Sequence, residues 1–407
     1  MEQSAPRTLL IYAPVPLYRK GGALYGEKQA LNGMRLWAAH FEKVIVMMPE
    51  SPEAPPPGWE PLSHHTNSLE RVQVEPLPMA YRPDQFFKVL RSTRRKIGDL
   101  IRMADYLSFA IGGLFGDWGA VAAFEAERQG RPFAVWTDRV ESEVVRRSIG
   151  QGTWRHSLRS RLYHRPMFQL EKKVIRRAAL GLFHGQETFD TYAPFCRNPH
   201  VVHDIHIAPK DHISDEALSD KMDAIPEGQI RIAYVGRADP MKGPMDWLEA
   251  LALMRDAGVI FQATWLGDGS ELEQMRAWVA EKGLTGQVDL PGFTDNRDAV
   301  RDLLQQAHIF LFCHKTPESP RCLIEALSAA APIIGYEGAY ARDLISAHQG
   351  GVLVPLGDVD ALAQAVITLE RDRVRLSELI GRAREDGRPF TDEAVFEHRS
   401  DLIKQYL

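Results

Sequence analysis

The chain has 407 residues, 44% hydrophobic and 25% charged, which is typical of a soluble globular protein, and its length suits two domains of about 200 residues better than one core. Its three cysteines are odd in number and lack Cys-x2-Cys spacing, which argues against a disulfide framework or a structural zinc. No apolar run reaches the roughly 18 residues that a membrane-spanning helix requires.

The first half of the chain alternates short apolar strands with helical stretches, which predicts a parallel sheet covered on both faces. We expect residues 1–208 to form this first domain. The N-terminal apolar run is short and interrupted by Pro14 and Pro16, without the basic flank of a signal peptide, so a cytoplasmic location is expected. The predicted strands are Leu9–Ala13, Lys43–Met48, Val72–Pro76, Phe133–Thr137 and Leu180–His184.

A glycine-rich segment, Tyr18–Gly26, follows the first predicted strand and reads YRKGGALYG. Gly21 and Gly22 would permit a ligand to approach the backbone closely. A plain tight turn explains the two glycines almost as well.

Asp138 directly follows the predicted strand Phe133–Thr137 and should lie at the carboxyl edge of the sheet. A carboxylate there could accept the proton of a hydroxyl group. The alternative is that Asp138 caps the next helix. His184 ends another strand, and a single strand-end histidine is expected to be structural.

Charge is distributed unevenly between the two halves. Residues 1–205 hold 28 basic and 21 acidic side chains, whereas residues 206–407 hold 21 and 33. Most of the excess positive charge lies in Arg82–Arg102 and Arg146–Arg177, where apolar residues are interleaved. This pattern is typical of contact with an anionic membrane surface or a phosphorylated acceptor, and a solvated helix packed on its own sheet is the alternative. No nucleic-acid partner is expected, because an acidic second half would repel a polyanion.

The second half predicts another doubly wound sheet over residues 209–388, followed by a terminal helix over residues 389–407. The polar segment Lys210–Gln229 is expected to be the linker. Two such sheets bind ligands at the carboxyl ends of their strands, which places the expected active site in a cleft between the domains. The strands are predicted near Ile232, Gln262, Val288, Ile309, Ile333 and Val352.

Two strand-loop-helix segments of the second half have features of a phosphate site. Arg231–Gly243 reads RIAYVGRADPMKG and places Arg237 and Lys242 on one loop, where an arginine fork and a lysine point charge would suit a diphosphate. Phe261–Glu271 reads FQATWLGDGSE and repeats the arrangement with a Gly-Asp-Gly turn. Both loops follow strands and should therefore meet at the same edge of the sheet.

A third segment, Thr316–Gly335, reads TPESPRCLIEALSAAAPIIG and predicts a loop, a helix over Cys322–Ala331 and a buried strand. The amides and the dipole at a helix N-terminus favour an anion, while Glu318 and Glu325 can accept hydrogen bonds from hydroxyl groups. An anion beside hydroxyl groups describes a nucleotide sugar.

In this order the motifs resemble the donor half of retaining family-4 glycosyltransferases of the GT-B fold, the glycosyltransferase group 1 type. The resemblance covers Arg231 to about Val354, and the first half only in outline. The family pattern separates its two glutamates by seven residues. Here Glu318 and Glu325 are separated by six, and Pro317 stands where the first glutamate belongs.

The resemblance implies a role for each matching position. Arg237 and Lys242 would hold the donor phosphates, Glu325 the ribose hydroxyls and Glu318 the transferred sugar. The expected catalytic residues are Arg237, Lys242, Glu318 and Asp138. The other expected donor-binding positions are Gly21, Gly22, Gly236, Gly267, Asp268, Gly292, Phe293, Arg321, Cys322 and Leu323.

The resemblance also implies the reaction: retaining transfer of a hexose-like sugar from a nucleotide-diphosphate sugar to a glycan, glycolipid or lipid-linked acceptor of polysaccharide synthesis. Neither a metal nor another cofactor is expected, since the cations and the helix terminus would stabilise the leaving diphosphate. Three alternatives remain: a GT-B sugar-nucleotide epimerase or hydrolase, a donor-binding pseudoenzyme, and a phosphorylase-like enzyme with a pyridoxal cofactor.

Overall fold

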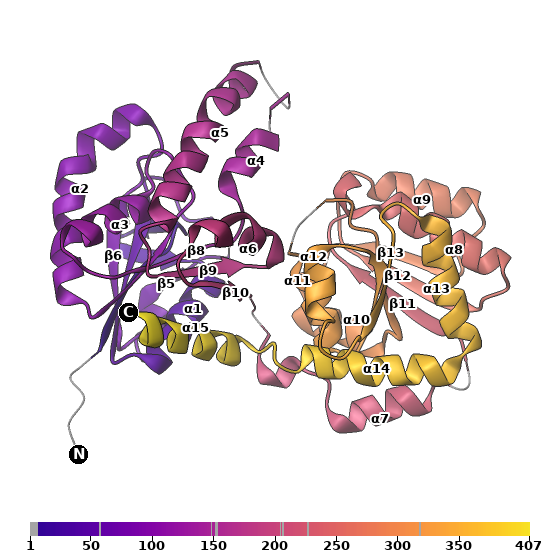
Figure 1. The fold of residues 1–407 in the computed structure, drawn as a ribbon. Coiled ribbons are helices and arrows are strands. Elements are labelled where there is room, and N and C mark those ends of the chain that lie inside the picture. The colour runs from indigo at the N-terminus through magenta and orange to yellow at the C-terminus, as the bar shows by residue number, and fades with distance from the viewer. Residues whose placement is uncertain are drawn as a thin grey trace. The chain divides into compact units, whose positions relative to one another are not determined.

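The computed structural model describes residues 7–407 except 57, 148, 151–153, 204, 206, 226–227 and 317–318, with only the backbone of 155 and 156. The chain divides into two compact α/β units (Figure 1). Unit 1 comprises residues 1–204 and 393–407, and unit 2 comprises Ile205–Asp392. The predicted boundaries at 208/209 and 388/389 lie within four residues of these divisions.

Unit 1 contains one ten-stranded sheet, in which parallel strands run in the order β10-β9-β8-β7-β1-β4-β6, and β2 also pairs parallel with β4. Its strands are β1 Thr8–Tyr12, β2 Leu17–Lys20, β3 Ala23–Gly26, β4 Lys43–Ser51, β5 Glu60–Pro61, β6 Val72–Pro78, β7 Tyr106–Ala110, β8 Ala134–Thr137, β9 Leu180–His184 and β10 Pro199–Val202. Its helices are α1 Lys28–His40, α2 Pro83–Met103, α3 Trp118–Arg128, α4 Glu141–Arg147, α5 Trp154–Ile175, α6 Gln186–Tyr192 and α15 Asp392–Tyr406.

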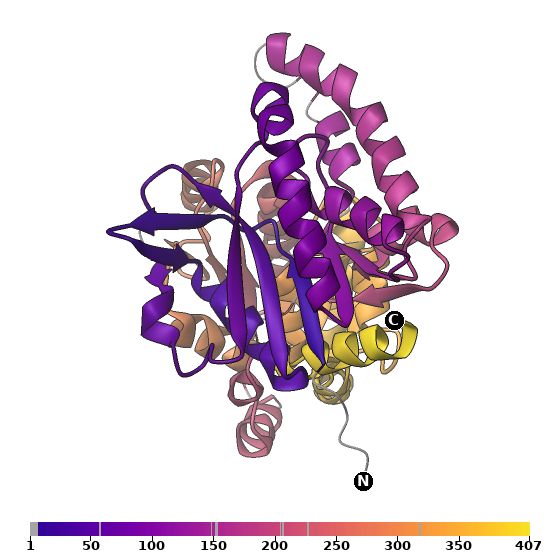
Figure 2. The same cartoon turned by 90° about the vertical axis from the view of Figure 1, so that its left-hand side faces the viewer.

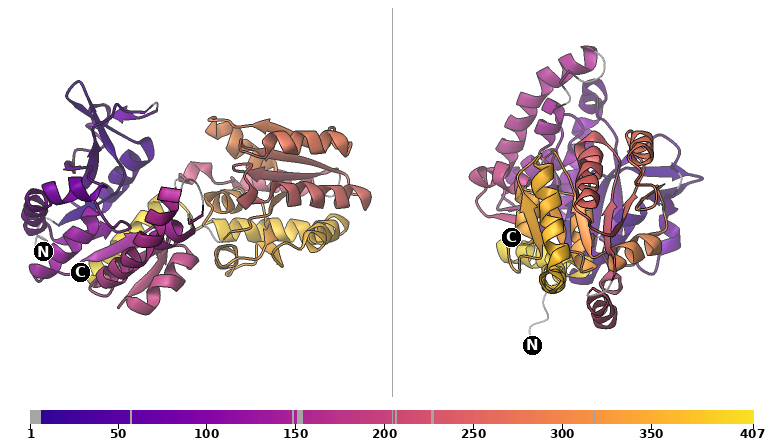
Figure 3. Two further views of the ribbon diagram at one scale, coloured as in Figure 1. Left: turned by 90° about the horizontal axis from the view of Figure 1, so that it is seen from above. Right: turned by 90° about the vertical axis from the view of Figure 1, so that its right-hand side faces the viewer.

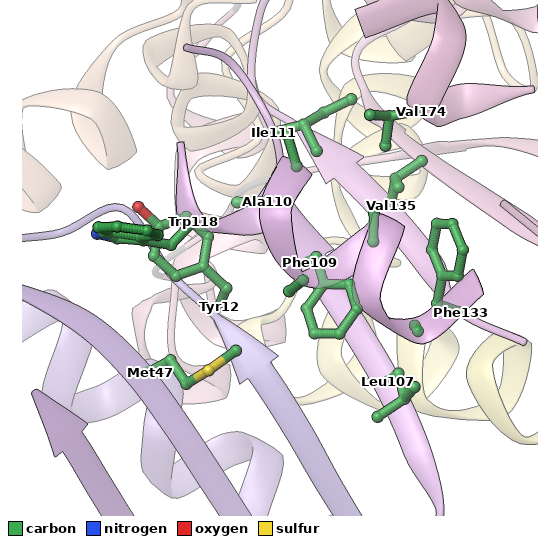
Figure 4. Close-up of a cluster of buried hydrophobic side chains, with 14 of the residues drawn as sticks. Tyr12, Met47, Leu107, Phe109, Ala110, Ile111, Trp118, Phe133, Val135 and Val174 are labelled. Atoms are coloured by element: carbon green, nitrogen blue, oxygen red, sulfur yellow. The ribbon is translucent and has the colours of Figure 1, made fainter. Parts of the chain in front are cut away.

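Alternating residues of the central strand β1 enter two different cores, one on each face of the sheet. Leu10 and Tyr12 pack with Phe109 and Trp118, in the cluster that Figure 4 shows from close by. Leu9 and Ile11 enter the other cluster, to which α1 and α15 also contribute. A strand buried on both faces reads as a continuous apolar run, which is why the sequence identified it readily.

The terminal helix α15 packs on unit 1. Leu402 and Ile403 are buried in the same cluster as β1, and the ring of Phe396 lies edge-on to Trp37, with centroids 5.0 Å apart. The last fifteen residues are therefore part of the first core, although they follow the whole of unit 2.

Unit 2 contains a six-stranded parallel sheet in the order β13-β12-β11-β14-β15-β16, with helices on both faces (Figure 3). The six predicted second-half strands and the five predicted first-half strands are confirmed. The strands are β11 Ile230–Val235, β12 Phe261–Leu266, β13 Val288–Gly292, β14 Ile309–Phe312, β15 Ile333–Tyr336 and β16 Gly351–Val354. The helices are α7 Asp215–Asp223, α8 Pro244–Asp256, α9 Leu272–Glu281, α10 Arg297–Gln306, α11 Arg321–Ser328, α12 Ala339–Leu344, α13 Val359–Arg371 and α14 Arg373–Gly387.

The prediction that Lys210–Gln229 is a linker is wrong. The described part of this segment contains α7, and the side chain of Lys221 is buried, donating hydrogen bonds to the carbonyl oxygens of Ala329 (3.1 Å) and Ala330 (2.7 Å) at the C-terminal end of α11. Its many polar residues made the segment look solvated, but Lys221 gives it a fixed place in unit 2.

No helix in the part of the chain that the structure describes combines the length and the apolar character needed to cross a membrane.

Three elements of unit 1 are tied together by the buried carboxyl group of Glu171 on α5. It accepts hydrogen bonds from the Ser142 amide (3.0 Å) and hydroxyl (2.6 Å) on α4, and from the Tyr192 hydroxyl (2.9 Å) on α6. Burial nevertheless raises its pKa to about 7, since these donors only partly replace the lost hydration.

We expect Glu171→Gln to change the pH dependence of stability. Between about pH 4.5 and 7 the folded state binds more protons at Glu171 than the unfolded state, so this group lowers stability as pH rises through that window. The variant should therefore gain stability relative to wild type between pH 4.5 and 8, by up to about 3 kcal/mol. Urea unfolding followed by circular dichroism would measure it.

Glu125→Gln is the matched control of opposite sign. Arg128 is the main reason that the pKa of Glu125 is lowered to about 2, so its carboxylate stabilises the fold above about pH 4.5, and this contribution is lost on acidification. Parallel pH profiles for the two variants would contradict the assignment.

Candidate functional site

The strand order of unit 2 has one point at which successive connections diverge, between β11 and β14. From β11 the chain proceeds to β12 and β13 on one side, and β14 begins the strands of the other side. In doubly wound sheets, ligands bind beyond the carboxyl ends of the strands at this switch point. The loops after β11, β12 and β14 are therefore the first place to look for a site.

The loops after β11 and β12 are joined backbone to backbone. The Gly236 amide donates to Leu266 O (3.0 Å), the Ala238 amide to Asp268 O (2.9 Å) and the Glu271 amide to Ala238 O (2.8 Å). A Cβ atom on Gly267 would lie 1.9 Å from Gly236 O, and Gly267 has φ +155°, which side chains rarely adopt. Glycine is required here because the two loops leave no room for a side chain.

Arg237 is exposed at the rim of these loops, where its guanidinium lies 3.2 Å from the Asp239 carboxylate. Asp239 also accepts hydrogen bonds from the amide and the hydroxyl of Ser270 (3.1 Å each). Asp239 thereby joins the Arg237 loop to the Gly-Asp-Gly loop. The Asp268 side chain is exposed and accepts from the Gly269 amide (2.8 Å).

Lys242 lies at the switch point itself, in the short 3-10 turn Pro240–Lys242, and is largely buried. The following residue, Gly243, has φ +64°, and a Cβ atom there would lie 2.3 Å from the carbonyl oxygen of Cys313 after β14. The Lys315 amide donates to Met241 O (2.9 Å). The loops after β11 and β14 are thus in direct contact around the lysine.

A buried histidine accompanies Lys242. Burial and the neighbouring ammonium group of Lys242 lower the pKa of His314 to about 3, so its imidazole is neutral at pH 7. Its Nε2 lies 2.8 Å from the Tyr234 hydroxyl on β11. The sequence reasoning missed His314, although a polar residue just after the buried strand Ile309–Phe312 was a usable signal.

The helix α11 begins at Arg321, and the expected donor-binding positions Arg321, Cys322 and Leu323 are its first three residues. Pro320, in the N-cap position, has no side-chain group that could bond to the first amides. The Leu323 side chain is buried in the core, and its amide donates to Pro320 O (3.2 Å). Glu318 lies outside the described residues, so its predicted contact with the sugar remains a prediction.

Glu325 lies on the next turn of α11 and is half-buried. Burial raises the pKa of its carboxyl group, and the nearby positive charges of Arg297 and Arg321 oppose that rise. Gly292 and Phe293, two of the expected donor-binding positions, lie at the end of β13. Gly292 has φ +86°, and the Phe293 ring is 76% exposed. An exposed aromatic ring provides a face on which a nucleobase can stack.

Gly21 and Gly22 form the turn of a β-hairpin instead of an open loop. Antiparallel β2 and β3 pair Lys20 with Ala23, and both glycines have positive φ, +58° and +82°. A two-residue turn with φ positive at both positions matches the twist of the strands. The hairpin is visible at the edge of the sheet in Figure 2. The conformation accounts for both glycines without a ligand.

Asp138 lies at the carboxyl end of β8, as predicted, and pairs with a histidine. One of its carboxylate oxygens is 2.5 Å from His184 Nδ1, and Arg399 on α15 contacts the opposite ring nitrogen. Because a guanidinium can only donate, His184 Nε2 is the acceptor in its contact with Arg399. The strands β7, β1 and β4 separate β8 from the hairpin strand β2, so unit 1 does not bring Asp138 and the glycines together.

Within the described residues, no group of three or more His, Cys, Asp or Glu side chains is arranged to hold a metal ion.

Comparisons with known proteins show what the second unit and the fold are similar to. Residues 215–386 match the family model described as glycosyl transferases group 1. The chain is 29% identical over 259 residues to the 2-deoxystreptamine N-acetyl-D-glucosaminyltransferase of Streptomyces fradiae, covering 58% of this chain and 59% of that protein. It is 28% identical over 198 residues, 48% of this chain and 52% of that one, to the GalNAc-alpha-(1->4)-GalNAc-alpha-(1->3)-diNAcBac-PP-undecaprenol alpha-1,4-N-acetyl-D-galactosaminyltransferase of Campylobacter jejuni.

Each of these matches spans little more than half the length of the curated relative. Among solved structures, Alr3699/HepE of Anabaena in complex with UDP has the same fold, with a TM-score of 0.66 and 14% identity, covering 98% of this chain and 100% of that one. The predicted GT-B fold, with two Rossmann-like domains, is thereby confirmed. The second unit, which holds the switch-point loops, is thus similar to the glycosyl transferases group 1.

Proposed function

We propose that this protein is a glycosyltransferase that moves a hexose-like sugar from a nucleotide-diphosphate sugar to a hydroxyl acceptor. The observation that carries the proposal is the contact of three strand-end loops near Lys242, at the edge of the sheet where α11 follows β14. A fixed ammonium group, an exposed guanidinium and helix amides are the groups that bind a diphosphate. The match of this unit to glycosyl transferases group 1 supports the same reading.

In this proposal the enzyme stabilises the leaving group. The bond between the anomeric carbon and the diphosphate oxygen breaks, and its electron pair stays on the diphosphate. Lys242 and Arg237 then meet more negative charge than in the ground state, so their interactions lower the barrier. The acceptor oxygen bonds to the anomeric carbon on the same face, and its proton goes to the departing phosphate oxygen, which retains the configuration of the donor.

The individual roles of the other residues follow from their places. Glu325 would accept hydrogen bonds from the ribose hydroxyls, Glu318 would contact the sugar, and Phe293 would stack on the base. Asp138, whose carboxylate is oriented by His184, would contact the acceptor hydroxyl from unit 1. Transfer would need no metal ion, since fixed cations take its place.

The chemical class of the partners is also part of the proposal. A uridine nucleotide is the first donor to test, because a protein of the same fold binds UDP. A glycan or lipid-linked acceptor of polysaccharide synthesis is supported by the Campylobacter relative, whose name describes a polyprenyl diphosphate acceptor.

Lys242→Ala should weaken the binding of UDP and of UDP-sugars alike. Loss of one charge-assisted hydrogen bond is worth about 1.5–3 kcal/mol, or about 10- to 100-fold in affinity. Isothermal titration calorimetry with a panel of nucleotide diphosphates and their sugars measures this effect. Lys282→Ala, which removes an exposed lysine of the same unit, is the matched control, and equal affinities in the two variants would refute the site.

Gly267→Ala should separate the loops after β11 and β12. The added methyl group meets Gly236 O at 1.9 Å in a strained backbone, so we expect nucleotide affinity to fall at least about tenfold and the melting temperature to drop. Gly286→Ala is the control, because nothing lies within 4 Å of its added methyl group and its φ lies outside the positive range that side chains rarely adopt. Unchanged nucleotide binding in Gly267→Ala would show that the loop contact is dispensable.

The product should keep the anomeric configuration of the donor, which proton NMR coupling constants at the anomeric centre report directly. The initial rate should be unchanged by EDTA, because the proposed leaving-group stabilisation uses side chains. An inverted product would reject the same-face mechanism, and loss of activity that added Mg²⁺ restores would reject metal independence.

A further inference from the structure

The long helix α5 of unit 1 consists of two halves with different surroundings, and Pro166 lies between them. A proline inside a helix lacks the amide that would bond to the preceding turn, so the hydrogen-bond ladder is interrupted there. Figure 1 shows α5 extending from the sheet of unit 1, with α4 beside its outer part.

The cations of the second half are engaged within unit 1. Lys172 and Arg176 lie over the Phe195 ring, at 4.2 and 5.5 Å from its centroid. Lys173 lies 5.4 Å from the centroid of Phe124, and Arg177 pairs with Glu127 at 2.9 Å. The cations of this half therefore pack within unit 1. This agrees with the alternative interpretation of the basic stretch, a helix packed on its own sheet.

The first half, which we call the outer segment and define as Trp154–Arg165, has the opposite character. Trp154, Leu158 and Leu162 are 71%, 48% and 62% exposed. Their spacing of four residues places them on one face of the helix. Arg161 and Arg165 are exposed along the border of this face, and in the part of the chain that the structure describes no ion pair joins either to a carboxylate.

The apolar face cannot be buried by a small inward movement of the helix. The inner face of the outer segment already lines a pocket of about 350 Å³ with Ser160, Tyr163 and Arg159, opposite Phe115 and Tyr81. Closing that pocket would move the exposed leucines inward without covering them, because they lie on the other side of the helix.

The second basic stretch, Arg82–Arg102 on α2, is a weaker candidate surface. Four of its cations are paired with carboxylates: Arg82 with Asp84, Arg94 with Glu125, Lys96 with Glu75 and Arg102 with Asp99. Paired side chains contribute little net charge to an approaching surface. Its other three cations, Lys88, Arg91 and Arg95, are exposed. The outer segment of α5 is the stronger candidate because its arginines border three exposed apolar side chains.

We propose that the outer segment docks on an anionic phospholipid surface. Trp154, Leu158 and Leu162 would enter the boundary between headgroups and acyl chains, while Arg161 and Arg165 contact the phosphate groups beside them. An apolar stripe bordered by arginines that pair with no carboxylate fits such a surface. When the apolar side chains reach the acyl boundary, the arginines lie at the level of the lipid phosphates. The inference rests on the proposed function only in that it would place the enzyme beside a lipid-linked acceptor.

Vesicle sedimentation tests this proposal with the full chain. Phosphatidylcholine vesicles with and without phosphatidylglycerol are mixed with the wild type, with Leu158→Ser/Leu162→Ser and with Arg161→Gln/Arg165→Gln. The wild type should bind the anionic vesicles on the order of tenfold more tightly than neutral ones, since each arginine near the surface adds about a factor of five. The leucine variant should lose binding to both, and the arginine variant should lose the preference for anionic lipid.

Ile260→Ser/Val374→Ser is the matched control, because it removes two equally exposed apolar side chains from unit 2. It should bind vesicles as the wild type does. Equal binding by all variants, or no binding by the wild type, would overturn the proposal. UDP affinity, measured on the same samples, should be unchanged throughout, so a failure of vesicle binding is distinguishable from a failure of the proposed donor site.

Discussion

The strand-end loops of unit 2 depend on a close backbone contact, in which Gly267 lies against the carbonyl oxygen of Gly236. Hydrogen bonds from Ala238 to the neighbouring loop and back hold the two loops at that distance. The same constraint recurs between Gly243 and Cys313, so three neighbouring strand ends meet through close backbone contacts at glycines. Because backbone is fixed to backbone, the side chains carried on these loops are placed by the sheet itself.

The sequence predicted most of unit 2 because its strands are short apolar runs followed by turn residues, a pattern that survives without any knowledge of contacts. The loop motifs were placed correctly for the same reason, since a residue after a parallel strand lies at a known edge of the sheet. His314 was missed because its role depends on Tyr234 and Lys242, which are neighbours only in space. The expected contact between Glu318 and the transferred sugar remains a prediction.

The errors concern segments whose composition conflicts with their burial. Lys210–Gln229 is polar, but Lys221 finds two carbonyl partners inside unit 2 and so its segment is not a linker. Of the two interpretations of Gly21–Gly22, the tight turn is present as a two-residue hairpin turn, and a contact with a ligand stays a prediction. The strand Tyr106–Ala110 was not predicted, because a short, mostly apolar run so soon after a long helix is hard to distinguish from the end of that helix.

The hydrogen bonds from Lys221 to Ala329 and Ala330 also bear on where the chain can be cut to obtain unit 2 alone. The helix α11 has only eight residues, which is too short to persist without outside support. Part of that support comes from α7, which precedes the first strand of its sheet in the chain. A fragment that begins at β11 would contain the whole sheet and all of the strand-end loops, yet it would lack the partner that secures the far end of α11. The smallest fragment in which unit 2 can fold alone therefore starts before Asp215.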